Sequence, residues 1–285
     1  MIATTSRPAP TAATAGRPLW PALLSRPYPA VMGVLNITPD SFSDGGRFVA
    51  PEHALAQARR MIAEGADIID IGAESTRPYG AEPVTAEEEL RRLRPILAEV
   101  VSLGIPVSID SMKPAVTDWA LDAGASIAND VWGLQRDPAM ARLVASRRCP
   151  VIVMHNRDRA DAGIDIMQDI AAYFARSLEI ADQAGISREN IVLDPGIGFG
   201  KTPEQSMTVL ARLDELGSFG LPLLVGASRK RFISSVTPSE PHQRLGGSIA
   251  AHVVAAIGGA RIIRTHDVAE TVQALRVAAA IRDRQ

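Results

Sequence analysis

The sequence contains very few of several kinds of group, and each shortage excludes a class of protein. Its 285 residues include one cysteine, Cys149, so an internal disulfide and a thiolate metal site are both excluded. No stretch approaches about 18 uninterrupted apolar residues, so we expect no membrane span. The 30 cationic and 32 anionic residues nearly balance, which leaves no basic excess for binding nucleic acid. We expect a protein of a reducing compartment, the cytoplasm, that neither binds nucleic acid nor spans a membrane.

Acidic residues are absent from the start of the chain, where the first is Asp40. Residues 1–28 are instead rich in Ala, Thr, Pro and Arg. Such a segment is either an organelle transit peptide or a disordered tail. We expect a flexible N-terminal extension over 1–28 and a single folded domain over 29–285.

From residue 30 onward, short β-rich runs alternate with longer helical stretches. The runs recur about every 20–40 residues, a spacing typical of βα units. Several are continuously apolar, as parallel strands covered by helices should be. The eight predicted strands are Ala30–Asn36, Asp67–Ile71, Pro106–Ile109, Ser126–Asn129, Pro150–Met154, Ile191–Leu193, Pro222–Val225 and Arg261–Arg264.

The predicted helices lie between these strands and include Pro51–Glu64, Ala86–Ser102, Asp165–Ala184 and Val268–Arg282. Eight strand–helix units in about 250 residues predict an α/β fold, a single-domain (β/α)8 TIM barrel. A doubly wound open sheet is the alternative. That fold usually carries a glycine-rich fingerprint after its first strand, and Asn36–Asp40 stands there instead.

Polar residues follow all eight predicted strands, at the barrel end where chemistry is found in this fold. Singly, each could be a helix cap or a surface residue. Together, they predict a site for an anion and a polar heterocycle. Arg77, Arg264 and His266 would hold the anion, while Asp110, Asn129 and Asp194 would meet the ring's polar edge. Asn36 and Asp40 would suit Mg²⁺ shared with a bound phosphate.

The glycine-rich segment Gly196–Thr202 resembles a nucleotide phosphate loop but is one residue too short before Gly200-Lys201. We therefore expect its glycines to let the backbone approach a flat ligand, with Phe199 as an apolar wall. Lysine is also rare, since only Lys113, Lys201 and Lys230 occur among 30 cationic residues. Each follows a strand end, which favours a specific role for each.

Five segments carry motifs at or near the predicted strand ends: Met32–Gly46, Gly65–Pro78, Asp194–Lys201, Ser228–Lys230 and Arg264–Asp267. Together they resemble the dihydropteroate synthase family of folate biosynthesis, and the resemblance covers about residues 30–282. Thr265, between Arg264 and His266, departs from the family's usual apolar residue, and we expect it to point away from the site.

The resemblance implies a transferase on a TIM barrel. It would join 6-hydroxymethyl-7,8-dihydropterin diphosphate to 4-aminobenzoate, releasing diphosphate, with Mg²⁺ as cofactor. It also implies a sulfonamide target that forms a homodimer, for which the apolar face of Val268–Arg282 could serve. The alternatives are a pterin-binding methyltransferase and a non-catalytic pterin-binding homologue. Neither is favoured, because the Ser-Thr-Arg-Pro and Ser-Arg-Lys segments are both present.

The family's site residues can be carried over position by position. The catalytic set implied is Arg264, His266, Lys230 and Asp110. The pterin would be held by Asp110, Asn129, Asp194 and Lys230, between Met154 and Phe199. Diphosphate and Mg²⁺ would meet Asn36, Arg264 and His266, with Asp40 as a second metal ligand. The aminobenzoate would be framed by Phe42, Thr76, Arg77, Pro78, Ser228 and Lys230.

Overall fold

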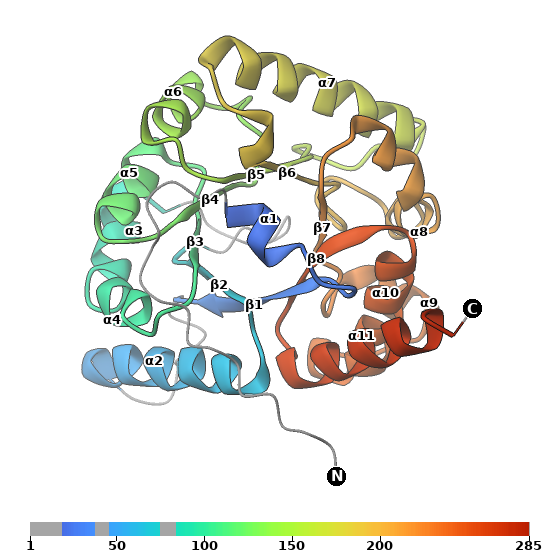
Figure 1. Ribbon diagram of the computed structural model, residues 1–285, viewed down its shortest axis with the longest axis horizontal. Helices are drawn as coiled ribbons and strands as arrows, with labels where there is room; N and C mark the ends of the chain where they lie inside the picture. The colour runs from blue at the N-terminus through green and yellow to red at the C-terminus, as the bar shows by residue number, and fades with distance from the viewer. Residues whose placement is uncertain (1–18, 38–45, 75–83, 285) are drawn as a thin grey trace.

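The computed structural model of the protein describes residues 19–37, 46–74 and 84–284. Eight parallel strands follow one another around a closed barrel, and the last pairs with the first (Figure 1). The predicted TIM barrel is therefore confirmed, and each predicted strand lies within one residue of the observed one at either end. The strands are β1 Ala30–Asn36, β2 Ile68–Gly72, β3 Val107–Asp110, β4 Ile127–Asp130, β5 Val151–Met154, β6 Ile191–Asp194, β7 Leu223–Val225 and β8 Ala260–Thr265.

Helices form a ring outside the barrel (Figure 1). One predicted helix, Ala86–Ser102, is divided into α3 and α4, because Pro95 cannot continue the backbone hydrogen bonding of a helix. The α-helices described are α1 Leu19–Leu23, α2 Gly46–Glu64, α3 Ala86–Leu93, α4 Leu97–Val101, α5 Pro114–Asp122, α6 Pro138–Arg147, α7 Ile166–Ala184, α8 Pro203–Ala211, α9 Arg231–Val236, α10 Leu245–Ile257 and α11 Val268–Arg282. Short 3₁₀ turns are η2 Arg188–Asn190, η3 Leu213–Phe219 and η4 Pro241–Gln243. Within the described ranges, no helix is both long and apolar enough to cross a membrane.

Side chains alternate along each strand between the helices and the barrel interior. In β2, for example, Ile69 and Ile71 pack in the outer core, whereas Ile68 belongs to an inner cluster. Thr265 follows the same rule, since its hydroxyl lies 3.1 Å from Thr271 of α11, outside the barrel. The inner cluster fills the N-terminal part of the barrel with Trp20, Ala30, Met32, Ile68, Ile127, Ile152, Val192, Leu224 and Ile262.

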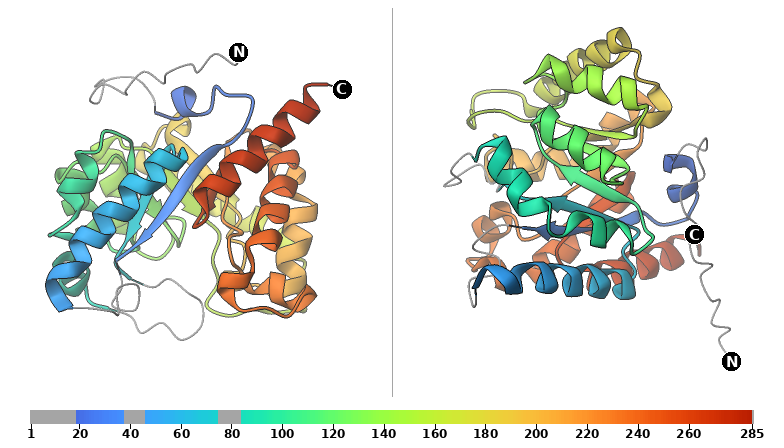
Figure 2. Two further views of the ribbon diagram at one scale, coloured as in Figure 1. Left: turned by 90° about the horizontal axis from the view of Figure 1, so that it is seen from below. Right: turned by 90° about the vertical axis from the view of Figure 1, so that its left-hand side faces the viewer.

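Helix α1 closes the N-terminal end of the barrel (Figures 1 and 2). Trp20 is 2% exposed, packs into the inner cluster, and donates its indole N–H to the carbonyl of Asn190 at 2.9 Å. The flexible extension predicted over 1–28 is therefore wrong for its last part. Its aromatic and apolar residues cover the open end of the barrel, and residues 1–18 lie outside the described part of the chain.

The next inward positions along the strands carry polar groups instead of apolar ones. Asp70 follows Ile68, Asn129 follows Ile127, and Arg264 follows Ile262, each by two residues. The same spacing that builds the inner cluster therefore points these side chains into the C-terminal half of the barrel.

Candidate active site

A pocket of about 310 Å³, its open mouth included, lies at the C-terminal end of the barrel. Its polar lining comes from the ends of strands far apart in the sequence, as expected for this fold. The lining residues are Asp110, Asn129, Val131, Met154, Asp194, Gly196, Ile197, Phe199, Gly226, Lys230 and Arg264.

Arg264 is fixed between two carboxylates beneath the pocket. Its Nε donates to Asp70 at 2.6 Å, and its Nη2 donates to Asp110 at 2.8 Å. Asp70 is fully buried and also accepts from the amide of Asn129 at 3.2 Å. These charge-assisted bonds hold the guanidinium in one orientation before any ligand binds.

Two buried carboxyl groups face the pocket from β3 and β6. Burial raises the pKa of Asp110, and the neighbouring carboxylates of Asp70 and Glu89 raise it further against the opposing effect of Arg264. Burial raises the pKa of Asp194 to about 6, although its carboxylate accepts from the backbone N–H of Gly196 at 2.7 Å. Oδ1 of Asp110 is buried and has no hydrogen-bond partner among the described residues. An N–H donor on a ligand would satisfy it.

Apolar side chains form the faces of the pocket. Met154, Phe199 and Val131 pack together as a separate small cluster. The ammonium of Lys230 lies 4.0 Å from the centre of the Phe199 ring, a cation–π contact. A planar ligand that fits between these faces would present its edge to Asp110, Asn129 and Asp194.

His266 follows β8 and is bonded to Ser228. The Ser228 hydroxyl accepts from the backbone N–H of His266 at 3.2 Å and lies 3.0 Å from Nδ1 of its ring. Because that oxygen already accepts, we assign its proton to the bond with Nδ1, which leaves the ring proton on Nε2. Burial, reinforced by Arg264, Arg229 and Lys230, lowers the pKa of His266 to about 3. His266 would therefore meet an anion as a neutral N–H donor through Nε2 and not as a cation.

A family model described as pterin binding enzyme matches residues 32–266, most of the chain and all the strand ends described above. The chain belongs to the pterin-binding enzyme family. It is 45% identical over 239 residues to the dihydropteroate synthase of Bacillus subtilis, and the aligned region covers 84% of this chain and 83% of that protein. It is also 46% identical over 260 residues to a probable bifunctional folylpolyglutamate synthase/dihydropteroate synthase of Haloferax volcanii, where it spans 89% of this chain and 31% of the longer protein.

Solved structures of this family share the fold. A dihydropteroate synthase from Clostridium difficile, crystallised in the presence of pteroic acid, superposes with a TM-score of 0.86 at 46% identity. The match covers 89% of this chain and 97% of that one. The Xanthomonas albilineans enzyme with 4-aminobenzoic acid also gives a TM-score of 0.86, at 44% identity, over 91% of this chain and 94% of that one.

The structure brings all six of the predicted ring-binding residues together in one pocket. Ser228 and His266 contact each other beside Arg264 but are not among the residues lining the pocket, and Asn36 ends β1 half-buried. The predicted residues Asp40, Phe42, Thr76, Arg77 and Pro78 lie outside the described part of the chain. The predicted residues that line the pocket are Asp110, Asn129, Met154, Asp194, Phe199, Lys230 and Arg264.

Sequence reasoning missed Asp70 and did not anticipate the partners of Lys113. Asp70 holds Arg264, yet it lies within an apolar strand, before the strand end where site residues are expected. Lys113 forms ion pairs with Glu74 and with Glu89, the latter at 2.8 Å, instead of facing the pocket. The alternation rule alone identifies Asp70 as inward-facing, since it stands two residues after Ile68.

Gly196 and Phe199 line the pocket as predicted, and two glycines of Gly196–Thr202 also pack closely against another segment. A Cβ at Gly196 would lie 2.0 Å from the carbonyl oxygen of His155, and one at Gly200 would lie 2.4 Å from Cβ of Arg157. Both glycines have positive φ angles, 65° and 53°. Their main requirement is close packing against the segment that follows β5, which has no room for a side chain.

Proposed function

We propose that the protein is a dihydropteroate synthase, which joins 6-hydroxymethyl-7,8-dihydropterin diphosphate to 4-aminobenzoate and releases diphosphate. The observation that carries the proposal is the pocket itself. Two buried carboxyl groups and the Asn129 amide line one pocket with the Met154 and Phe199 side chains and a fixed arginine. The family match and the enzymes of known name at about 45% identity support the same reaction.

The pterin ring would be held by its edge and its faces. The ring carries N–H and amino groups, which donate to carboxylates and to the amide oxygen of Asn129. Diphosphate leaves from the methylene carbon as the C–O bond breaks, and the electron pair goes to the phosphate oxygen. The resulting positive charge on the pterin is stabilised by the carboxylates of Asp110 and Asp194.

Charge that develops on the leaving diphosphate would be met by Arg264 and Lys230 as cations and by His266 as a neutral donor through Nε2–H. The 4-aminobenzoate nitrogen then attacks the methylene carbon and loses a proton. Its neutral amine is already nucleophilic, so the reaction requires no strong base at this position.

We propose Mg²⁺ as the cofactor, bound jointly by the protein and the diphosphate. Asn36 contributes a single amide oxygen at the end of β1, and no group of three or more acidic, histidine or cysteine side chains in the described ranges forms a metal cage. Such a sparse donor set fits Mg²⁺, which binds few protein ligands when phosphate oxygens share it. Bound there, Mg²⁺ would offset negative charge on the leaving group.

The test of the function is an assay of diphosphate release from 6-hydroxymethyl-7,8-dihydropterin diphosphate. Release should require both 4-aminobenzoate and Mg²⁺, and 7,8-dihydropteroate should form in equal amount. A sulfonamide should compete with 4-aminobenzoate. Release that is indifferent to 4-aminobenzoate would refute the assignment, as would methyl transfer in its place.

We further propose a homodimer that buries the outer face of α10 and α11, two helices that pack side by side (Figure 1). Ile257 is 79% exposed and Ile281 is 64% exposed, and Val254 and Val277 of the same helices are about half exposed. Large exposed apolar side chains on neighbouring helices are typical of subunit interfaces. In light scattering, the variant Ile257→Asp/Ile281→Asp should be monomeric and the unchanged protein dimeric. Equal masses would refute the interface.

A further inference from the structure

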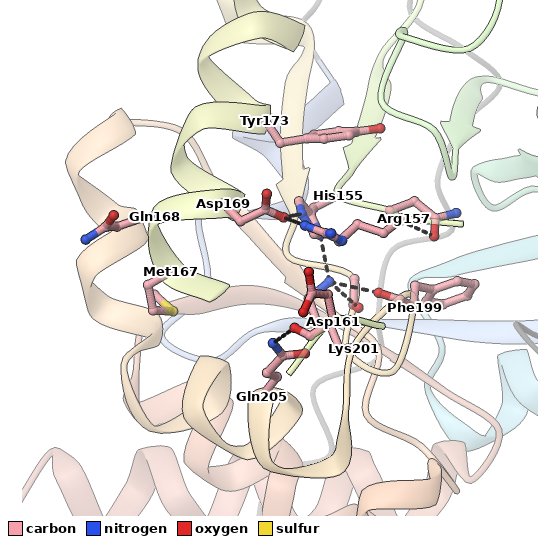
Figure 3. A network of polar contacts seen from close by, with 12 residues as sticks. His155, Arg157, Asp161, Met167, Gln168, Asp169, Tyr173, Phe199, Lys201 and Gln205 are labelled. Atoms are coloured by element: carbon pink, nitrogen blue, oxygen red, sulfur yellow. Dashed lines mark hydrogen bonds and ion pairs between the residues drawn. The ribbon is translucent and has the colours of Figure 1, made fainter. Parts of the chain in front are cut away.

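The ammonium group of Lys201 lies behind the glycine-rich segment that forms one wall of the pocket (Figure 3). Lys201 is 4% exposed. Its Nζ donates to the carbonyl oxygens of Gly196 at 2.9 Å and Phe199 at 3.1 Å, and lies 2.7 Å from Nδ1 of His155. Three acceptors thus match the three N–H donors of an ammonium group. Lys201 therefore does not point into a phosphate-binding loop.

A chain of polar contacts connects this ammonium to the surface. Nε2 of His155 lies 2.9 Å from Asp169 Oδ2, and Nη1 of Arg157 lies 2.9 Å from the same oxygen (Figure 3). His155 is fully buried, whereas Asp169, on α7, is 29% exposed. The carboxylate of Asp169 fixes the histidine with its proton on Nε2, so that Nδ1 accepts from Lys201.

The segment that Lys201 holds has little conformational preference of its own. Gly196, Gly198 and Gly200 all have positive φ angles, and glycine loses more freedom on ordering than any other residue. Phe199, in the middle of this run, lines the pocket and packs against Met154. Its ring position therefore depends on whatever fixes the surrounding carbonyl groups.

We propose that Lys201 is a positioning residue for ring binding. Its ammonium, oriented by His155 and Asp169, fixes the carbonyls of Gly196 and Phe199 and thereby the aromatic wall of the pocket. This inference rests on the proposed function, because it takes a pterin as the ligand of that wall.

The arrangement makes ring binding sensitive to alkaline pH. Burial lowers the pKa of Lys201 to about 7, opposed by the carboxylates of Asp194 and Asp169 and assisted by Lys230 and Arg157. Burial lowers the pKa of His155 to about 3, so the imidazole remains an uncharged acceptor. Loss of a proton from Lys201 removes one donor and turns a lone pair toward an acceptor. Affinity for the ring should therefore fall as pH rises through the pKa of Lys201.

The experiment measures the dissociation constant of pteroic acid by calorimetry between about pH 5 and 9. The variant Lys201→Met should bind roughly 10-fold or more weakly and should lose the alkaline decline in affinity. Asp169→Asn removes an anion that raises the pKa of Lys201, so the decline should begin at lower pH. Trp20→Leu, at the opposite end of the barrel, is the control for instability. It should lower the melting temperature without changing the dissociation constant.

Unchanged affinity in Lys201→Met, or an alkaline decline that Asp169→Asn leaves in place, would overturn the positioning role. Should Lys201→Met fail to fold, the pH profile of Asp169→Asn decides alone. Failure of the unchanged protein to bind pteroic acid would instead refute the proposed function, so the two failures are distinguishable.

Discussion

The residues of the pocket differ in how well the sequence alone predicts their role. Asp110, Asn129 and Arg264 stand at strand ends, where a polar residue after an apolar run is conspicuous. Asp70 stands inside a strand and is identified only by the alternation of inward and outward positions. The neutral state of His266 depends on its burial beside Arg264, a property that no motif carries.

At the residue scale, Arg264→Ala should reduce turnover on the order of 100- to 1000-fold, as losing one preorganised charge donor typically does. The change also leaves Asp70 buried without its cation. Steady-state kinetics would check it, and the melting temperature should be recorded alongside. Turnover close to that of the unchanged protein at an unaltered KM would contradict the role of Arg264 in leaving-group departure.

The two buried carboxyl groups predict how ring binding responds to acid. A ligand that donates N–H groups favours the charged forms of Asp110 and Asp194, whose pKa values are raised in the empty pocket. Affinity for pteroic acid should therefore begin to fall as pH drops below about 7, where Asp110 takes up a proton, and fall more steeply below about 6, by up to ~100-fold per pH unit when both groups take up protons. In Asp194→Asn the slope should fall to that of one proton, and calorimetry from about pH 4.5 to 8 would measure it. An unchanged slope would exclude Asp194 as a titrating ligand-binding group.

The raised pKa values of Asp110 and Asp194 affect folding stability in the opposite direction to ring binding, because acid favours the folded state. A carboxyl group whose pKa is higher in the folded state binds protons there more tightly than in the unfolded chain. Its contribution to stability is therefore greatest at low pH and is lost as pH rises through the folded pKa. The pocket thus gives up some stability near neutral pH in order to present charged acceptors.

Helices and strands were the most predictable level of the molecule. Eight apolar runs and the helical segments between them were sufficient to predict the order and direction of the strands, because parallel strands joined by helices can be arranged in only a few ways. The break between α3 and α4 was signalled by Pro95 but not anticipated. The contacts of Lys113 could not be read from its neighbours, since Glu74 and Glu89 come from other elements.

At the scale of elements, the ion pairs of Lys113 connect the end of β2, the helix α3 and the segment before α5. Glu89 is fully buried, and burial raises the pKa of its carboxyl group. Lys113→Met should lower the free energy of unfolding by about 3–5 kcal/mol, because it leaves buried carboxylates unpaired. Urea denaturation would measure the loss. The double variant Lys113→Met/Glu89→Gln should recover part of it, and a double variant no more stable than the single one would contradict this explanation.

The residues that stabilise the barrel and the residues of the candidate active site lie at opposite ends of the barrel axis. The N-terminal half is filled by apolar side chains and covered by α1, whereas the C-terminal half carries the charged groups. Composition predicted a flexible extension at the start of the chain, and this was wrong for Trp20. Its burial depends on the space that the folded barrel leaves at its N-terminal end, which composition does not reveal. Nothing in the sequence near Trp20 indicates that the N-terminal end of the barrel has room to bury its indole ring.

Trp20→Ala tests this division at the scale of the molecule. Removing the buried indole should lower the free energy of unfolding by about 3–5 kcal/mol, through lost burial and the cavity that remains. Denaturant titration would measure the loss, and KM values for both substrates should stay unchanged under conditions where the variant is folded. A change in KM without a loss of stability would show that the two ends of the barrel are coupled.

The position of α1 also has a practical consequence for handling the enzyme. Anything joined ahead of Leu19 is attached at the face opposite the entrance used by substrates. A purification tag or a surface linker placed there should leave catalysis unchanged. Deleting the chain up to residue 28 would instead remove α1 and expose the apolar N-terminal end of the barrel.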